Sequence, residues 1–209
     1  MQLKEAIEAR ASVRKFAPDA VAVADLQEMA RCAGLAPSVN NEQPWKFIAI
    51  LNKPLMASMA QAVHQHLDQL FPDTPTARDQ SVKNTVEYYS TFFKDAPALI
   101  AVVSKNYEAM VDKLLPLTKI GHKDVNALRN YPDVQSLGAA IQNILLCAVD
   151  LGYGACWLSG MMVARQELEG LLHIAEPWHL TAFVAVGRPA GPVRQRDKKS
   201  IEEIFQVIE

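Results

Sequence analysis

Hydrophobic residues recur at helical spacing in four parts of the chain. The pattern predicts helices over these ranges: 3–10, 24–35, 53 to about 70, and 135–151. The last range is apolar on nearly every face, so this helix is expected at the centre of the molecule and not on its surface.

Short runs rich in β-branched and aromatic residues lie between these helices. They predict strands over four ranges: 45–51, 98–103, 155–158 and 180–186. The run ALIAVV at 98–103 is wholly apolar, as a central strand would be. Helices that alternate with strands, with no long linker, predict a single domain of the α+β or α/β class over residues 1–209.

Composition and charge narrow the possible partners. The net charge of −2 argues against a nucleic-acid-binding surface, which needs a basic excess. The longest apolar run, Ile144–Val149, is far shorter than the roughly 20 residues of a membrane span. Acidic residues near the first methionine are untypical of a signal peptide. We therefore expect a cytoplasmic protein without nucleic-acid or membrane partners.

The thiols and imidazoles have simple interpretations. Cys32, Cys147 and Cys156 are odd in number and lack a CxxC spacing, which predicts buried, reduced thiols; a catalytic cysteine is the alternative. His64 and His66 stand two residues apart on a predicted helix and point in different directions, so we expect no metal site.

Two polar segments could hold a ligand. In an extended chain Arg10, Ser12 and Arg14 share one side, where they could grip a phosphate; a solvated basic turn is the alternative. The segment APSVNNEQPW at 36–45 joins a helix to a strand. Pro44 favours an extended Gln43, which would point Gln43 the same way as Asn41. Such amides could recognise a ribityl chain or a pyrimidine edge, or simply cap a turn.

The segment GYGACWLSG at 152–160 follows the central helix. Gly152 suits the C′ position of that helix, and Ser159 and Gly160 come at the end of the next strand. Small residues there would let main-chain N–H groups approach a planar ligand, unless the turn is purely structural. The segment from Gly187 to Lys199 is basic. On composition alone, a solvated tail without a ligand is as good an interpretation of it as a functional one.

Taken together, five segments make the chain resemble the FMN-dependent nitroreductase family: ARASVRKF, APSVNNEQPW, GAAIQNILL, GYGACWLSG, and VAVGRPA with its basic tail. The resemblance covers nearly the whole chain. It implies an α+β (α/β/α-like) fold with a mixed, mostly antiparallel sheet flanked by helices, in an intertwined homodimer. It also implies a lid or substrate region at about 72–132, and an arm within 187–209 that crosses to the partner.

The resemblance also implies a set of FMN-binding residues. They are Arg10, Ala11, Ser12, Arg14, Pro37, Ser38, Asn41, Gln43, Trp157, Leu158, Ser159, Gly160, Arg196 and Lys198. The phosphate would lie near Arg10, Arg196 and Lys198, and the loop at 37–43 would reach the flavin partly from the other subunit. The family often has an acidic residue where Ser136 stands here, which we interpret as an exchange of helix caps.

The implied activity is a ping-pong reaction. NADH or NADPH would pass a hydride to flavin N5, and the flavin would then reduce a small electron-poor acceptor such as a nitroaromatic or quinone, with no catalytic side chain. Two alternatives stay open: a specialised relative (dehalogenase, enone reductase or oxygen-dependent flavin enzyme), or a flavin carrier or sensor without turnover. The aromatic residues Tyr88, Tyr89, Phe92 and Phe93 would line a substrate lid or pack in the core.

Overall fold

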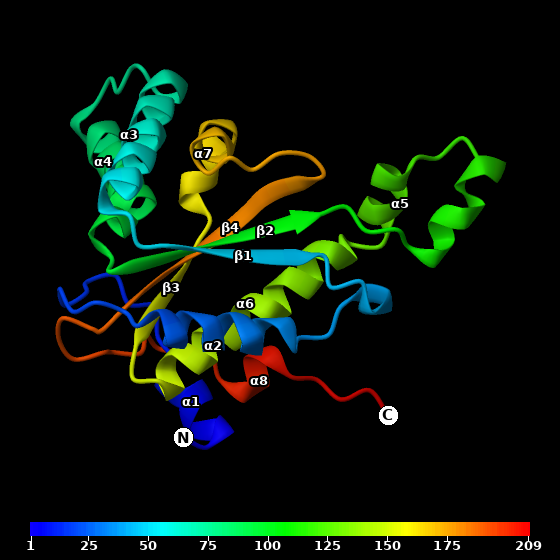
Figure 1. The fold of residues 1–209 in the computed structure, drawn as a ribbon, viewed down its shortest axis with the longest axis horizontal. Coiled ribbons are helices and arrows are strands. Elements are labelled where there is room, and N and C mark those ends of the chain that lie inside the picture. Colours follow the sequence, from blue (N-terminus) through cyan, green and yellow to red (C-terminus); the bar gives the residue numbers. More distant parts are fainter.

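The computed structural model describes residues 1–209 as a four-stranded sheet between two layers of helices (Figure 1). The strands are β1 (Trp45–Ile50), β2 (Ala98–Lys105), β3 (Gly154–Leu158) and β4 (Trp178–Gly187). Their order is β1-β2-β4-β3, and all three ladders are antiparallel. One isolated parallel bridge, between Ser12 and Ala155, makes the sheet mixed. The predicted fold of the single chain is confirmed, and the intertwined homodimer stays a prediction.

Eight α-helices and four short 3₁₀ turns connect the strands. The helices are α1 (Leu3–Ala9), α2 (Val23–Gly34), α3 (Lys53–Leu70), α4 (Ala77–Thr91), α5 (His122–Leu128), α6 (Pro132–Asp150), α7 (Arg165–Leu171) and α8 (Ile201–Ile204). The turns are η1 (Val39–Asn41), η2 (Phe92–Asp95), η3 (Met110–Leu117) and η4 (Gly160–Ala164). None of the helices combines the length and apolar character needed to span a membrane.

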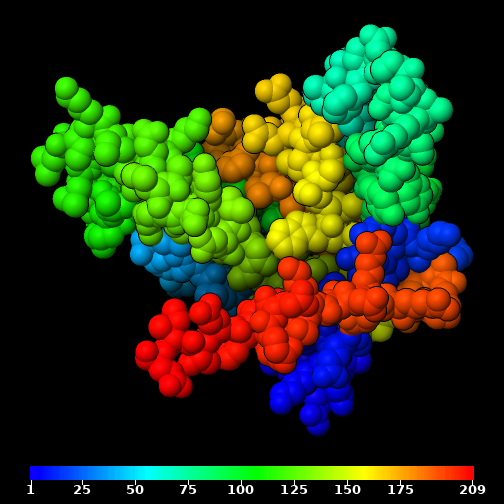
Figure 2. Space-filling view, turned by 180° about the vertical axis from the view of Figure 1, so that it is seen from behind, coloured from blue at the N-terminus to red at the C-terminus, as the bar shows by residue number.

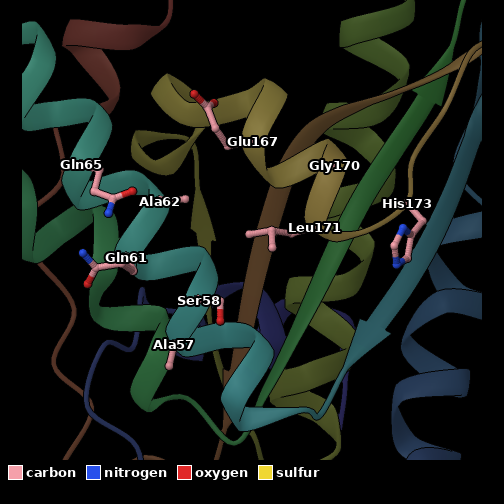
Figure 3. A pocket seen from close by; sticks show the side chains of 9 residues that line it. All are labelled: Ala57, Ser58, Gln61, Ala62, Gln65, Glu167, Gly170, Leu171 and His173. Carbon is pink, nitrogen blue, oxygen red and sulfur yellow. The ribbon is translucent and has the colours of Figure 1, made fainter.

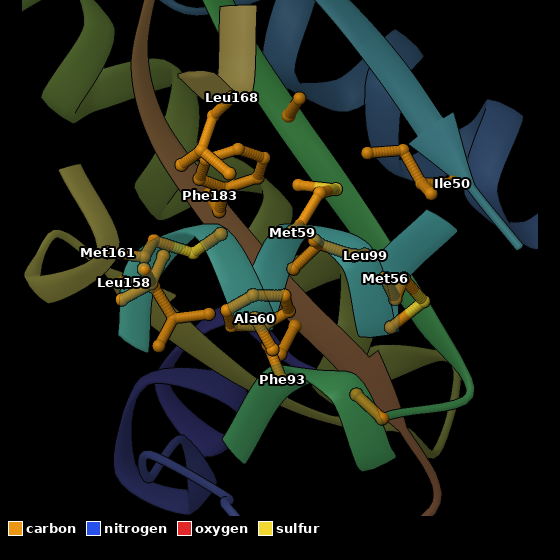
Figure 4. Packing of buried hydrophobic residues seen from close by; sticks show 14 of the residues in the cluster. Ile50, Met56, Met59, Ala60, Phe93, Leu99, Leu158, Met161, Leu168 and Phe183 are labelled. Carbon is orange, nitrogen blue, oxygen red and sulfur yellow. The ribbon is translucent and has the colours of Figure 1, made fainter. Parts of the chain in front are cut away.

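The alternation of side chains along β2 explains the two layers. Leu99, Ala101 and Val103 face a core built with α3, η2, η4 and α7, and the intervening residues face a core built with α2 and α6. Figure 4 shows the first core, where Met59 of α3 lies near Phe183 of β4 and Met56 lies beside Leu99 of β2. Because β2 is buried on both faces, its residues 98–103 are apolar without interruption, as predicted, and only Ser104 and Lys105 at its end are polar.

The central helix α6 is confirmed as a buried element. It packs against α2 and β3 and starts at Pro132, three residues earlier than predicted, with the proline in the first turn, where its missing N–H costs nothing. Gly152 follows the helix with φ 78°, the left-handed conformation expected at C′.

The range 72–132, predicted to carry the lid and substrate contacts, spans several parts of the fold. It contains β2, a central strand, and the segments on either side of β2 lie outside the sheet: 72–95, which includes α4, and 106–131, which includes η3 and α5. In Figure 1 the second segment projects away from the sheet.

Candidate functional site

The N-terminal segment lies along the edge of β3 and also touches the chain after β4. Val13 N–H donates to the Ala155 carbonyl at 3.0 Å, and Ala190 N–H donates to the Lys15 carbonyl at 3.0 Å. A Cβ at Gly154 would come within 2.5 Å of Val13, so only glycine permits this approach. Figure 2 shows the blue N-terminal segment beside the orange segment after β4. Residues about 180 positions apart in the chain therefore meet here.

A cavity of about 240 Å³ lies where these two segments meet. It is lined by Arg10, Ala11, Ser12, Arg14, Arg194, Gln195, Arg196 and Lys198. Five of the eight lining side chains are cationic and none is acidic. None of the five forms an ion pair in the chain. Uncompensated cations around one small cavity favour binding of an anion such as a phosphate.

The structure thus brings together six of the residues that the sequence predicted for the cofactor. The extended interpretation of residues 10–14 is confirmed, because α1 ends at Ala9 and Ser12 forms a bridge with β3. Arg194 and Gln195 were missed. Gln195 Nε2 donates to the Arg10 carbonyl at 3.1 Å and ties the tail to the N-terminal segment. Arg194 lies two positions before Arg196, and that spacing in the basic tail was the available signal.

The end of β3 is open to a ligand on one side. Trp157 is 45% exposed, while Leu158 is 4% exposed and packs in the core, so Leu158 could meet a cofactor only through its main chain. Ser159 and Gly160 are exposed. An exposed main chain at this point could donate hydrogen bonds to a planar ligand.

Gly160 also packs closely against α4. A Cβ at Gly160 would lie 2.7 Å from Ser90 Oγ. We expect Gly160→Ala to destabilise the fold by about 1–3 kcal/mol through overpacking, measured by urea unfolding. In the double variant with Ser90→Ala the clashing oxygen is gone, so most of the loss should be recovered. A double variant no more stable than Gly160→Ala would contradict this contact.

The loop before β1 differs from its predicted conformation. Gln43 has φ 46°, not the extended conformation expected before Pro44, and Asn40 and Asn41 also have positive φ. Two hydrogen bonds hold this conformation: Gln43 N–H donates to Ser38 Oγ at 3.0 Å, and Gln43 Nε2 donates to Asn41 Oδ1 at 3.3 Å. The two amides therefore do meet, but through a left-handed turn and not through an extended strand.

Ser136 connects this loop to α6. It lies inside the helix and not at its cap: its hydroxyl donates to the Pro132 carbonyl at 2.8 Å and accepts from Val39 N–H at 3.2 Å. The predicted cap exchange is therefore wrong. Pro37, Ser38, Asn41 and Gln43 do not line the cation cavity, and Figure 1 shows the loop at the opposite end of α2 from the N-terminal segment. One chain alone does not bring the two predicted parts of the site together.

The aromatic group of residues 88–93 is divided between core and surface. Phe92 and Phe93 are buried in the core at 4% and 0% exposure. Tyr88 and Tyr89 are exposed, and the guanidinium of Arg14 lies 5.3 Å from the Tyr89 ring centroid. Both interpretations of this group are therefore correct in part, and Tyr89 connects α4 to a cation of the candidate site.

The thiols are not activated, and two of the histidines contact carboxylates. Burial raises the pKa of Cys147 to about 12 and also raises the pKa of Cys156, so neither is activated as a nucleophile. His64 of α3 contacts Glu87 of α4 at 2.8 Å, which joins the two helices, and it contacts Asp68 of its own helix at 3.3 Å. His66 contacts Glu167 on α7.

The largest cavity, about 820 Å³, is a groove between α3 and α7. Figure 3 shows that its polar side chains are spread out, with Glu167 and His173 far from each other. The groove holds no arginine or lysine, so it lacks the concentrated positive charge of the cavity near Arg10.

Comparisons with known proteins agree with this arrangement. A model of the Nitroreductase family matches residues 7–188. A BluB-like flavoprotein from Clostridium difficile 630 is 32% identical, with a TM-score of 0.90 and complete coverage of both chains. YfhC of Bacillus subtilis, which bears the name of an NAD(P)H nitroreductase, is 23% identical over 97% of this chain and 92% of its own length. An iodotyrosine deiodinase solved with FMN and 3-iodo-L-tyrosine is 19% identical, with a TM-score of 0.71 and complete coverage of both chains.

Proposed function

The chain belongs to the Nitroreductase family, and from this premise we propose that it is an FMN-dependent NAD(P)H oxidoreductase. The observation that carries the proposal is the cavity of five unpaired cations, whose lining residue Ser12 is bridged to Ala155 of β3. The deiodinase of the same fold binds FMN, and YfhC is named for NAD(P)H, which supports this cofactor and this donor.

The residues present fit FMN. Arg10, Ser12, Arg196 and Lys198 would hold the phosphate, because they offer charge-assisted hydrogen bonds with no competing carboxylate among the lining residues. The main chain of Ser159 and Gly160 would hold the ring system. Gly160 suits this role because it is exposed and has no side chain to block a planar group.

FMN, when bound, supplies the hydride and electron transfer. The chain's own residues bind and orient the cofactor and the substrates. Arg14 would place a positive charge beside the ring, which favours the reduced, anionic form. No side-chain acid, base or nucleophile is required, in agreement with the raised pKa values of Cys147 and Cys156.

A second copy of the chain would complete the site. The loop with Pro37, Ser38, Asn41 and Gln43 lies away from the cation cavity of its own chain, and we propose that it contributes to the site of another copy. The C-terminal segment supports this proposal, because the apolar side chains of Ile201, Ile204 and Phe205 are about 60% exposed in the single chain. We therefore propose a cytoplasmic homodimer, which light scattering of the purified protein would detect as twice the 23.1 kDa chain mass.

The visible spectrum tests the proposed function. We expect the purified protein, or the protein after addition of FMN, to be yellow, and anaerobic NADH or NADPH to bleach the flavin band. A colourless protein that takes up no added FMN would refute the proposal. A yellow protein that neither nucleotide bleaches would indicate a carrier or sensor, or an enzyme supplied by another reductant.

The acceptor is proposed at the level of a class: an electron-poor small molecule such as a nitroaromatic or quinone. The similarity to a deiodinase favours a second candidate, reductive dehalogenation. Reoxidation of the bleached protein by a nitroaromatic, a quinone or 3-iodo-L-tyrosine, followed in the same cuvette, distinguishes the two candidates.

A further inference from the structure

A second cavity, of about 340 Å³, lies beside the cation cavity. It is enclosed by three segments: residues 12–15, Tyr88 and Tyr89 at the end of α4, and residues 189–194 after β4. The two cavities share Ser12, Arg14 and Arg194. The other lining residues differ, so each cavity can be changed without the other.

The lining of this cavity combines positive charge with exposed aromatic rings. Arg14, Lys15 and Arg194 line it, none of them forms an ion pair, and no acidic residue faces them. Tyr88 and Tyr89 are 46% and 43% exposed, with their ring centroids 5.3 Å apart. Aromatic faces stack on planar bases, and cations bind phosphates, so this combination suits a nucleotide better than a simple anion.

The cavity is close to the open end of β3. Ser90 directly follows Tyr89 on α4, and its Oγ would be 2.7 Å from a Cβ at Gly160. When the nicotinamide ring of a dinucleotide lies beside Gly160, the rest of the molecule therefore passes next to Tyr89. The cation cavity on the other side of Arg14 would be filled by the phosphate of FMN, which leaves the second cavity for another ligand.

We propose that the cavity between residues 12–15, the two tyrosines and residues 189–194 binds the adenosine diphosphate half of the nicotinamide donor. The proposal rests on the function proposed above and adds to it where the donor is held. Lys15 and Arg194 bind its phosphates, and Tyr89 stacks with the adenine. Arg14 lines both cavities, and its guanidinium lies 5.3 Å from the Tyr89 ring centroid, so the donor site and the cofactor site share this side chain as well as Ser12 and Arg194.

The test uses ADP as the probe on the FMN-loaded protein, because ADP has no nicotinamide and its binding does not require turnover. Calorimetry should detect ADP binding, and ADP should inhibit NADH oxidation competitively. Adenosine and pyrophosphate, each with half of the recognised chemistry, should bind at least about tenfold more weakly than ADP. Pyrophosphate that binds as tightly as ADP would overturn the proposal, because it would indicate a plain anion site.

A pair of lysine variants separates the two cavities. Lys15 lines only the second cavity, and Lys198 lines only the first. Lys15→Gln should weaken ADP binding about tenfold with little effect on FMN affinity, and Lys198→Gln should do the reverse, since each removes one charge-assisted contact. Equal effects of the two variants on both ligands would contradict separate sites.

The stacking role is tested at Tyr89. Tyr89→Phe keeps the ring and should bind ADP within about twofold of the native chain, whereas Tyr89→Ala should lose about tenfold. Equal ADP affinity in Tyr89→Ala would refute the stacking. A yellow protein that NADH bleaches but that does not bind ADP would overturn this inference and leave the proposed flavin function intact. A colourless protein would instead refute the flavin function.

Discussion

Phe183→Ala should lower the free energy of unfolding by about 3–5 kcal/mol. Phe183 is fully buried at 0% exposure on β4, in the core that β2 and β4 share with α3 and α7. Removing the ring leaves a cavity that the neighbouring strands cannot close, because both are fixed in the ladder. The loss would be a large part of the roughly 5–15 kcal/mol that stabilises a typical domain.

Denaturant unfolding of the FMN-free protein measures this effect without the stabilisation that a ligand adds. Leu128→Ala is the matched control, because Leu128 is 79% exposed at the end of α5 and should change stability by no more than about 0.5 kcal/mol. A loss below about 1 kcal/mol in Phe183→Ala would contradict the packing described for this core.

Arg10→Ala should raise the dissociation constant for FMN by about 10–100-fold and leave fold stability nearly unchanged. A charge-assisted hydrogen bond contributes about 1.5–3 kcal/mol, and tenfold in affinity corresponds to about 1.4 kcal/mol. Arg10 forms no ion pair within the chain, and its contact with Gln195 uses only its main-chain carbonyl, which alanine retains.

Fluorescence quenching of free FMN on titration with apoprotein gives the affinity. Arg78→Ala is the control: Arg78 is exposed in the first turn of α4, outside both cavities, and its loss should not alter FMN binding. Unchanged affinity in Arg10→Ala would remove Arg10 from the phosphate site. A similar loss in both arginine variants would show that overall charge, and not the cavity, attracts the phosphate.

Periodicity found the four strands and the two long helices α3 and α6, and it missed α4, α5 and α7. All four strands and the helices α1, α2, α3 and α6 were predicted within about three residues of their bounds. The helix α4 was missed because only Ser90 is buried on it, so it has no apolar stripe. Thr76 and Asp79 form a capping box at its start, and that motif was a signal available in the sequence.

The loop before β1 shows where a local rule failed. Pro44 disfavours the helical region for Gln43 but leaves the left-handed region to be decided by other contacts. Ser38 Oγ accepts from Gln43 N–H and stabilises that region here. A hydrogen bond between residues five positions apart depends on the conformation of the whole loop, so no rule for neighbouring residues could predict it.

The cation cavity was predictable in its members but not in its assembly. Arg10, Arg14, Arg196 and Lys198 were identified from the family resemblance, whereas composition alone left both basic segments open to interpretation as solvated. Their meeting depends on hydrogen bonds between residues 15–17 and 188–190, which lie about 170 positions apart in the chain. The second cavity has no sequence signal, because α4 reaches it only through tertiary packing.

The position of β3 at the edge of the sheet gives the N-terminal segment a protective role as well. An uncovered edge strand presents unpaired N–H and C=O groups that can recruit strands from other molecules. Residues 12 and 13 occupy part of that edge, with Val13 packed against Gly154. Deleting the residues up to and including Val13 would therefore leave the edge of β3 with unpaired main-chain groups. Such a protein should aggregate during expression whether or not flavin is supplied.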